Sequence, residues 1–440
     1  MTGTPGELSE ADSVPHRKAL EINLDPSQYG TFAEIGAGQE VADWFLRVGG
    51  ASGTVAQTIC AYDKAFSDER YGHGTRYVSR ERLLAMLDRE YRTLESQLRA
   101  SHGSEVRFFA FADTIAARSF RGDNEQHGWV GLRFQAAAGA DPSDILLHVA
   151  LRDRTVEMQR SALGVLGVNL VHAAYRQKAD PHAFLPAVFE GLSLERLEID
   201  VIELAGPAFS GQDSRLWCLE ALRLGLARAL VLDAKGRPEQ PSTVLRKRTL
   251  IVEGGGYTGT VDPRVLVSAA FSQLGHEAGK EHEQPMLLLD VRLEQLSATA
   301  EAASVDERLR QLTARAPIIV THQSELHPVV DYLRRYTTGP IRTVTSVAAF
   351  AALISGTYET LPGALLESLG KLLVEDVRLY IYPVPMKTFQ DARAKDPRRR
   401  VDASSSGDMV GLGDLSCAPP LNHLLQYLRG AGWLVSLGLP

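Results

Sequence analysis

The residues best suited to chemistry gather in one glycine-rich stretch near the start of the chain. Glu34 interrupts an apolar run just before Gly36 and Gly38, and Gln39 and Glu40 follow. A glycine turn that feeds a helix presents unpaired N–H groups suited to a phosphate or carboxylate. We therefore interpret Gly36, Gly38, Gln39 and Glu40 as ligand contacts and Glu34 as a catalytic base. Glu34 and Glu40 would repel an anion. The alternative interpretation is therefore a turn that only ends a strand.

Histidines on apolar segments form a second group of candidates. His148 lies in an otherwise apolar strand-like run, and His172 lies on an apolar helical segment with Asn169 one turn earlier. A buried polar side chain must be hydrogen-bonded, so these residues either line a pocket or organise the core. We predict His148 and His172 as catalytic residues, and His127 and Asn169 as ligand-binding residues. A satisfied core pair is the alternative.

A second glycine-rich run, residues 254–259, matches G-x-G-x-x-G after a strand-like segment and before a helix that Asp262 can cap. The next predicted strand carries Asp290, in the position of a ribose contact in a dinucleotide site. Two features oppose this interpretation. The last glycine stops short of the helix cap, and Asp290 lies farther along than the ~20 residues of the fingerprint.

Other catalytic and metal signatures are missing from the sequence. It contains no H-E-x-x-H or H-x-H arrangement and no G-x-S-x-G nucleophile elbow. We therefore predict no metal site, and the sequence specifies no cofactor.

Composition narrows the class of protein. The chain has 440 residues, 44% hydrophobic and 23% charged, with a net charge of -7. This balance predicts no nucleic-acid or membrane partner. Three widely spaced cysteines favour a reducing compartment, and we see neither an apolar signal core nor a run of ~20 apolar residues. The prediction is a cytoplasmic protein.

The order of apolar patterns predicts an α/β fold with two domains. The first is a mixed α+β domain, and the second is a doubly wound domain with a mainly parallel sheet. The predicted segments are a disordered tail at 1–18, the mixed domain at 19–240, the doubly wound domain at 241–383, a flexible loop at 384–413 and a C-terminal docking helix at 414–440.

Local patterns inside the first domain predict its elements. We expect a short helix over 54–65 and a long helix over 156–176. Between them, strands over 107–114, 128–135 and 144–151 are joined by short connections, which favours an antiparallel meander.

Several strings are similar to those of a family of bacterial proteins of similar length. They are INLDPSQYGTFAEIGAGQEVADWF, FFAFADT, HGWVGLRFQ, DILLHVAL, ALGVLGVNLVHAAY and LLESLGKLL. Members of the family carry two conflicting names, nicotinate-nucleotide adenylyltransferase and TonB-dependent receptor. The first name implies a Rossmann fold with an H-x-G-H signature, which this sequence lacks. The second implies an outer-membrane barrel, which the helical patterns here contradict.

Two functions fit these observations. The first is a cytosolic enzyme or binder of a small, phosphorylated or nucleotide-like metabolite, with its site in the first domain. The second is a non-catalytic scaffold that associates with itself. The sequence specifies no reaction.

Overall fold

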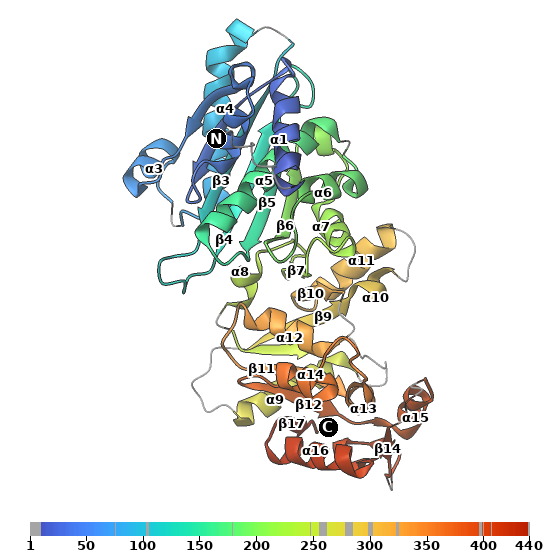
Figure 1. The fold of residues 1–440 in the computed structure, drawn as a ribbon. Coiled ribbons are helices and arrows are strands. Elements are labelled where there is room, and N and C mark those ends of the chain that lie inside the picture. The colour runs from blue at the N-terminus through green and yellow to red at the C-terminus, as the bar shows by residue number, and fades with distance from the viewer. Residues whose placement is uncertain are drawn as a thin grey trace. The chain divides into compact units, whose positions relative to one another are not determined.

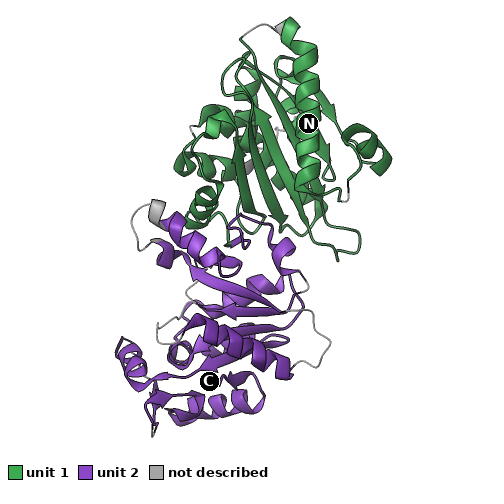
Figure 2. Cartoon of the chain, turned by 180° about the vertical axis from the view of Figure 1, so that it is seen from behind, with its two compact units in different colours: residues 1–230 green, residues 231–440 purple. Residues whose placement is uncertain are grey.

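The chain folds into two compact units, residues 1–230 and 231–440 (Figure 2). The computed structural model describes residues 10–74, 76–102, 105–177, 179–246, 248–254, 262–277, 285–297, 302–322, 325–395, 398, 400–405 and 407–438. The predicted fold class is confirmed, with a mixed sheet in the first unit and a parallel, doubly wound sheet in the second (Figure 1).

Unit 1 is built on a six-stranded sheet of order β2-β1-β3-β4-β5-β6. Strands β2, β1 and β3 are parallel, and β3 to β6 pair antiparallel as the predicted meander requires. Its elements are α1 (Glu10–Asn23), β1 (Gln28–Ile35), α2 (Glu40–Arg47), η1 (Ala51–Gly53), β2 (Val55–Ile59), α3 (Lys64–Tyr71), α4 (Arg80–His102), β3 (Arg107–Ala116), β4 (His127–Phe134), β5 (Ser143–Leu151), α5 (Val156–Arg176), α6 (Pro181–Phe189), β6 (Leu197–Ala205), η2 (Pro207–Phe209) and α7 (Ser214–Arg223).

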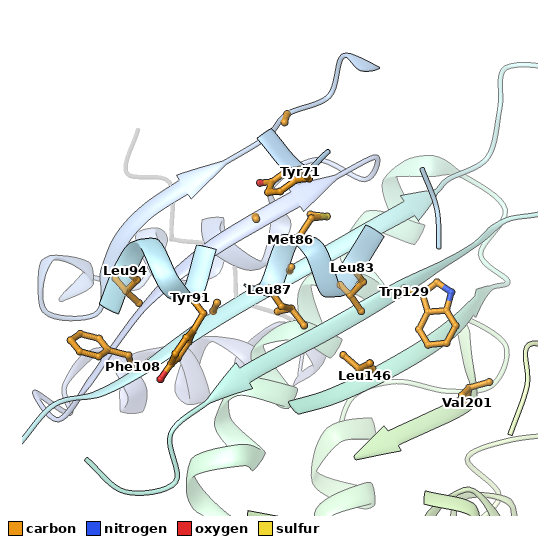
Figure 3. Packing of buried hydrophobic residues seen from close by; sticks show 14 residues of the cluster. Tyr71, Leu83, Met86, Leu87, Tyr91, Leu94, Phe108, Trp129, Leu146 and Val201 are labelled. Atoms are coloured by element: carbon orange, nitrogen blue, oxygen red, sulfur yellow. The ribbon is translucent and has the colours of Figure 1, made fainter. Parts of the chain in front are cut away.

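Helices cover the two faces of this sheet differently. On one face, Leu83, Leu87 and Tyr91 of α4 form a buried cluster with side chains of β3 to β6, including Trp129 (Figure 3). On the other face, α5 lies against α2. A Cβ atom at Gly167 of α5 would come within 2.3 Å of Val41, so only glycine permits this approach.

Two predictions for unit 1 are wrong. Helix α1 begins at Glu10, inside the expected tail, and its Lys18 and Ile22 are buried. The expected helix over 54–65 is instead strand β2 followed by the start of α3. β-Branched residues dominate β2, and pairing with β1 outweighs the weak helical pattern.

Unit 2 contains a seven-stranded sheet of order β17-β12-β11-β8-β9-β10-β7. The neighbouring strands from β17 to β10 pair in parallel. Its elements are β7 (Ala229–Leu232), α8 (Pro241–Leu245), β8 (Leu250–Glu253), α9 (Pro263–Glu277), β9 (Met286–Arg292), α10 (Leu293–Ser297), α11 (Ala302–Thr313), β10 (Ile318–Thr321), α12 (Leu326–Arg334), β11 (Ile341–Ser346), α13 (Val347–Ser355), α14 (Ala364–Leu372), β12 (Val377–Tyr382), β13 (Val384–Pro385), α15 (Met386–Lys395), β14 (Val401–Ala403), β15 (Met409–Val410), η3 (Leu412–Asp414), β16 (Leu415–Cys417), α16 (Pro419–Gly430) and β17 (Leu434–Ser436).

Counting from β8, six of these strands have the order 3-2-1-4-5-6. This is the strand order of doubly wound dinucleotide-binding folds. In these folds the strand order reverses between the first and the fourth strands, which are neighbours in the sheet. The reversal here lies between β8 and β11, which pair directly.

The last part of the chain is more ordered than its composition suggests. Helix α15 and the three short strands β13, β14 and β15 occupy the stretch expected as a flexible loop, and Phe389 of α15 is buried. After α16, strand β17 joins the main sheet beside β12, so the C-terminal segment supplies a strand as well as the expected helix.

Candidate functional site

A cavity of about 530 Å³ opens in unit 2 at the carboxyl ends of β8, β9 and β11. Gly254 follows β8, Asp290 and Arg292 end β9, and Thr345 lies near the end of β11. Ligands of open α/β sheets bind outside the carboxyl ends of strands where the strand order reverses. The volume also falls in the range of small-molecule sites, about 300–1,000 Å³.

Asp290 is the most unusual side chain in this cavity. It is only 5% exposed, and its Oδ1 atom is buried without a hydrogen-bond partner. Burial raises the pKa of Asp290 to about 6, and the positive charge of Arg292 offsets that effect only in part. An unpartnered buried carboxylate costs stability, so this group is suited to accept hydrogen bonds from a ligand.

The far wall of the cavity is a loop that follows α13. Gly356, Thr357, Tyr358, Glu359 and Thr360 line it, and the Tyr358 hydroxyl donates a hydrogen bond to the Leu353 carbonyl at 2.7 Å. Tyr358 has a φ of 51°, a left-handed conformation that is rare outside glycine. Backbone strain of this kind is concentrated at ligand sites.

A larger hollow of about 870 Å³ follows one side of α9. Small and polar residues such as Ala269, Ser268 and Ser272 line much of it, and it lacks a buried charged side chain among the residues described there. The smaller cavity is therefore the better candidate. Residues 255–259 of the second glycine-rich run lie outside the described residues, whereas Gly254 lines the smaller cavity.

Glu34 in unit 1 is occupied by its own chain. Its Oε2 atom accepts a hydrogen bond from the Val41 N–H at 3.0 Å, and Oε1 accepts one from the Ala42 N–H at 2.9 Å. The carboxylate thus caps α2, whose N-terminus carries a partial positive charge. The N–H groups that we expected to hold an anion bind Glu34 instead. Arg47 at the end of α2 does not pair with Glu34; it forms an ion pair with Asp43 on its own helix.

A second carboxylate lies beside Glu34 on the same face of the sheet. Asp113 of β3 stands opposite Glu34 in the register and accepts a hydrogen bond from the Ile35 N–H at 3.1 Å. Burial raises the pKa of Glu34 to about 7, despite the two backbone hydrogen bonds. Burial and the neighbouring Glu34 also raise the pKa of Asp113 well above its usual value.

The glycines and polar residues of the first turn have packing roles. A Cβ atom at Gly36, whose φ is 102°, would lie 1.9 Å from the Ile115 carbonyl oxygen. Gly38 lies against the Arg160 side chain. Gln39 donates a hydrogen bond to Thr58 at 3.0 Å, and Glu40 pairs with Arg160 at 2.6 Å.

His172 and Asn169 belong to a polar cluster that joins α5 to α1 and α6. Asn169 accepts a hydrogen bond from the buried Lys18 amine at 2.8 Å and donates to the Val188 carbonyl at 3.0 Å. His172 contacts Glu21 of α1 at 2.8 Å. These contacts fit a polar pair that organises the core, although His172 Nδ1 is buried without a hydrogen-bond partner.

His127 and His148 are the candidates that the structure brings together. His127 Nδ1 lies 3.0 Å from His148 Nε2, and His148 Nδ1 lies 2.5 Å from Asp200 Oδ1. His148 lies opposite Trp129 in the strand register, and Trp129 packs against α4. Glu34 and Asp113 lie on the opposite face of the sheet.

The three predicted catalytic residues therefore contact separate partners. Glu34 caps α2, His148 joins His127 and Asp200, and His172 pairs with α1. Sequence reasoning missed Asp113 as a partner of Glu34. Its signal was a carboxylate inside the apolar run FFAFADT, which also marks a buried polar residue.

The sequence analysis predicted neither a metal site nor a membrane partner. Within the described residues, no group of three or more His, Cys, Asp or Glu side chains is arranged to hold a metal ion. None of the helices in this part of the chain combines the length and hydropathy needed to cross a bilayer.

The chain matches no family model and no curated protein sequence. Three solved structures are similar to part of it. The competence/damage inducible protein CihA from Agrobacterium tumefaciens is 21% identical, with 40% of this chain and 99% of that chain covered and a TM-score of 0.27. A CinA superfamily protein from Enterobacter cloacae is 11% identical, with 39% and 96% covered and a TM-score of 0.28. A competence or damage-inducible protein from Enterobacter asburiae is 10% identical, with 36% and 95% covered and a TM-score of 0.27. TM-scores this low do not define a function.

Proposed function

We propose that unit 2 binds a nucleotide in the cavity between β8, β9 and β11, with a ribose hydroxyl donating to Asp290. The observation that carries this proposal is the unpartnered, buried carboxylate oxygen of Asp290 at the reversal of a 3-2-1-4-5-6 sheet. In such folds an acidic residue at the end of the second strand binds ribose, and β9 is that strand.

Two arginines in the cavity support a nucleotide over an uncharged ligand. Arg292 and Arg398 line the same cavity as Asp290, together with Glu325 and Glu359, so a phosphate has to lie beside the arginines and away from the carboxylates. Arginine side chains suit phosphate oxygens, while the carboxylate opposes a phosphate at its own position. The combination favours an unphosphorylated ribose, as in NAD, over a ribose 2′-phosphate, as in NADP.

The proposal is tested by isothermal titration calorimetry of the full chain with NAD, NADP, AMP and ATP. We expect NAD to bind and NADP to bind more weakly. Replacing Asp290 with Ala should weaken NAD binding about tenfold to a hundredfold, because a buried hydrogen bond to a charged group is lost. AMP binding in place of NAD would narrow the ligand to a mononucleotide.

The matched control is Asp331→Asn, which alters an exposed carboxylate of α12 paired with Arg335. That variant should bind NAD like the wild type. Absence of heat with all four nucleotides, or equal affinities in the Asp290 variant, would contradict the proposal. The alternative of a self-assembling scaffold stays a prediction, which light scattering coupled to size-exclusion chromatography tests.

A further inference from the structure

Helix α13 of unit 2 is apolar on all of its sides. Its sequence, VAAFAALIS, contains no charged residue, and one side, which includes Phe350 and Ile354, is buried. A second stripe consists of Ala349, Ala352 and Leu353, at the spacing of one helix face, and lines the cavity of about 530 Å³. A helix that is apolar all round is expected to be buried all round. Here Ala352 is exposed and Ala349 and Leu353 are half-buried, so the cavity side of α13 is suited to an apolar part of a ligand.

The same cavity also holds the buried, unpartnered Oδ1 atom of Asp290, which is a second and independent sign of a ligand. Glu253 of β8 stands opposite Val344 of β11 and Leu289 of β9 in the register. Asp290 and Val344 therefore lie at nearly the same level of the sheet, two strand spacings or about 10 Å apart. A base attached to a ribose at Asp290 can reach across this distance to the α13 side of the cavity.

The ring of Tyr358 borders the cavity beside α13 and is held in place. Its hydroxyl donates a hydrogen bond to the Leu353 carbonyl at 2.7 Å, and its ring packs edge-on to His327 with ring centroids 6.2 Å apart. A Cβ atom at Gly356 would lie 2.5 Å from the Tyr358 ring, so glycine leaves the room that the ring needs. A wall that is fixed before the ligand arrives lowers the entropy cost of binding.

The loop around Tyr358 adds polar groups at the rim of this apolar wall. Thr357, Glu359 and Thr360 line the cavity and are exposed. A purine base matches the arrangement, because its ring faces stack on apolar groups while its edge carries hydrogen-bond donors and acceptors. An aliphatic ligand would match the apolar wall but not the polar rim.

We propose that Ala349, Ala352 and Leu353 of α13, together with the Tyr358 ring, form the pocket for the purine base of the nucleotide. This role rests on the nucleotide binding proposed above for the cavity. Ala349 is the specificity-determining residue, because its small side chain lets a planar ring approach the helix closely. The polar groups of the loop after α13 face the edge of the base, and Asp290 holds the ribose.

The first test compares AMP with ribose 5-phosphate, which lacks the base, by isothermal titration calorimetry of the full-length wild-type protein. We expect AMP to bind at least tenfold more tightly, because the base buries apolar surface against α13. AMP and ribose 5-phosphate of equal affinity would overturn the proposal. This comparison needs no variant, so it does not depend on the folding of one.

The second test enlarges the wall with Ala349→Ile. A β-branched side chain is stiff at χ1 in a helix, so it cannot turn away from the base. The AMP affinity should fall about fivefold to a hundredfold, since the added methyl groups occupy space that the base needs. Circular dichroism establishes that the variant is folded. An unchanged or higher AMP affinity in the folded variant would overturn the proposal.

The matched control is Ala394→Ile, which makes the same change at an exposed alanine of α15 that does not line this cavity. This variant should bind AMP like the wild type. The two proposals for the cavity fail in different ways. If NAD binds and Asp290→Ala weakens it while Ala349→Ile does not, the base pocket is wrong and the nucleotide site stands. If neither NAD nor AMP binds the wild type, both are wrong.

Discussion

Units 1 and 2 each hold an acidic side chain at the carboxyl end of a parallel strand, close to a glycine. In unit 1 the side chain is Glu34, whose two oxygens accept hydrogen bonds from the N-terminus of α2. In unit 2 it is Asp290, whose Oδ1 atom lacks a partner and whose side chain lines a cavity of about 530 Å³. The same kind of sequence pattern therefore supports packing in one unit and leaves a carboxylate oxygen open to a ligand in the other.

The difference lies in the groups that each carboxylate meets, because a helix follows both strands, α2 after β1 and α10 directly after β9. The N–H groups of Val41 and Ala42 in α2 reach Glu34, whereas Asp290 Oδ1 lacks a hydrogen-bond partner. Asp290 instead lies on β9, one strand away from the glycine that comes after β8. Its carboxylate lines the cavity outside the carboxyl ends of the strands, close to the point where the strand order reverses. An acidic residue beside a glycine turn thus indicates a site only if no helix of its own uses the carboxylate.

The largest expected effect is the difference in stability between the variants Gly36→Ala and Gly254→Ala. Gly36→Ala should lower the free energy of unfolding by about 2–5 kcal/mol, because it combines left-handed strain with a Cβ atom 1.9 Å from a carbonyl oxygen. Gly254→Ala should change it by less than about 0.5 kcal/mol, since the nearest atom would be 3.7 Å away. Urea denaturation of both variants measures this, and equal losses would break the comparison.

Replacing Glu34 and replacing Asp290 should change the free energy of unfolding in opposite directions. Glu34→Ala should lower the free energy of unfolding by about 2–3 kcal/mol, because two buried N–H groups lose their acceptor. Asp290→Asn should raise it by about 1 kcal/mol in the absence of ligand at pH 8, because a buried unpartnered charge is removed. Urea denaturation midpoints of the two variants measure both changes.

Asp43→Ala serves as the control for Glu34, since Asp43 is half-exposed and pairs with Arg47 on the same helix. It should shift the denaturation midpoint little. A destabilised Asp290→Asn protein would mean that the carboxylate has a structural role like that of Glu34.

A pH dependence of the free energy of unfolding is also expected, and it belongs to unit 1. The folded pKa of Glu34 is about 7 against an ordinary value of 4.5, so the folded state holds an extra proton between these values. The free energy of unfolding should therefore fall as the pH rises from about 4.5 to 7, by at most about 1.4 kcal/mol per pH unit for one proton. The pKa of Asp113 is also raised well above its usual value, so Asp113 contributes to the same slope, and Asp113→Asn should reduce it. Guanidinium titrations at several pH values measure the slope, and an unchanged slope would show that folded Asp113 does not hold an extra proton.

Local sequence patterns were enough to predict much of the architecture. The long helix over 156–176 and the meander of three strands follow from local periodicity, and the structure confirms them within two residues at each end. The alternation of strands and helices after residue 241 likewise predicted the doubly wound sheet. Local patterns failed where pairing decided the outcome, as in β2, whose short β-branched segment becomes a strand only because β1 lies beside it.

Which polar residues meet depends instead on the tertiary fold. Ile35 and Asp113 are 78 positions apart, and His148 and Asp200 are 52 apart, yet each pair is in hydrogen-bond contact because their strands are neighbours in the sheet. Strand order is a long-range property that single-residue patterns do not encode. The same order brings Gly254, Asp290 and Thr345 to one cavity, although they lie on different strands far apart along the chain. Burial was readable from the sequence, but whether a buried carboxylate has a partner depends on the groups that the fold brings against it.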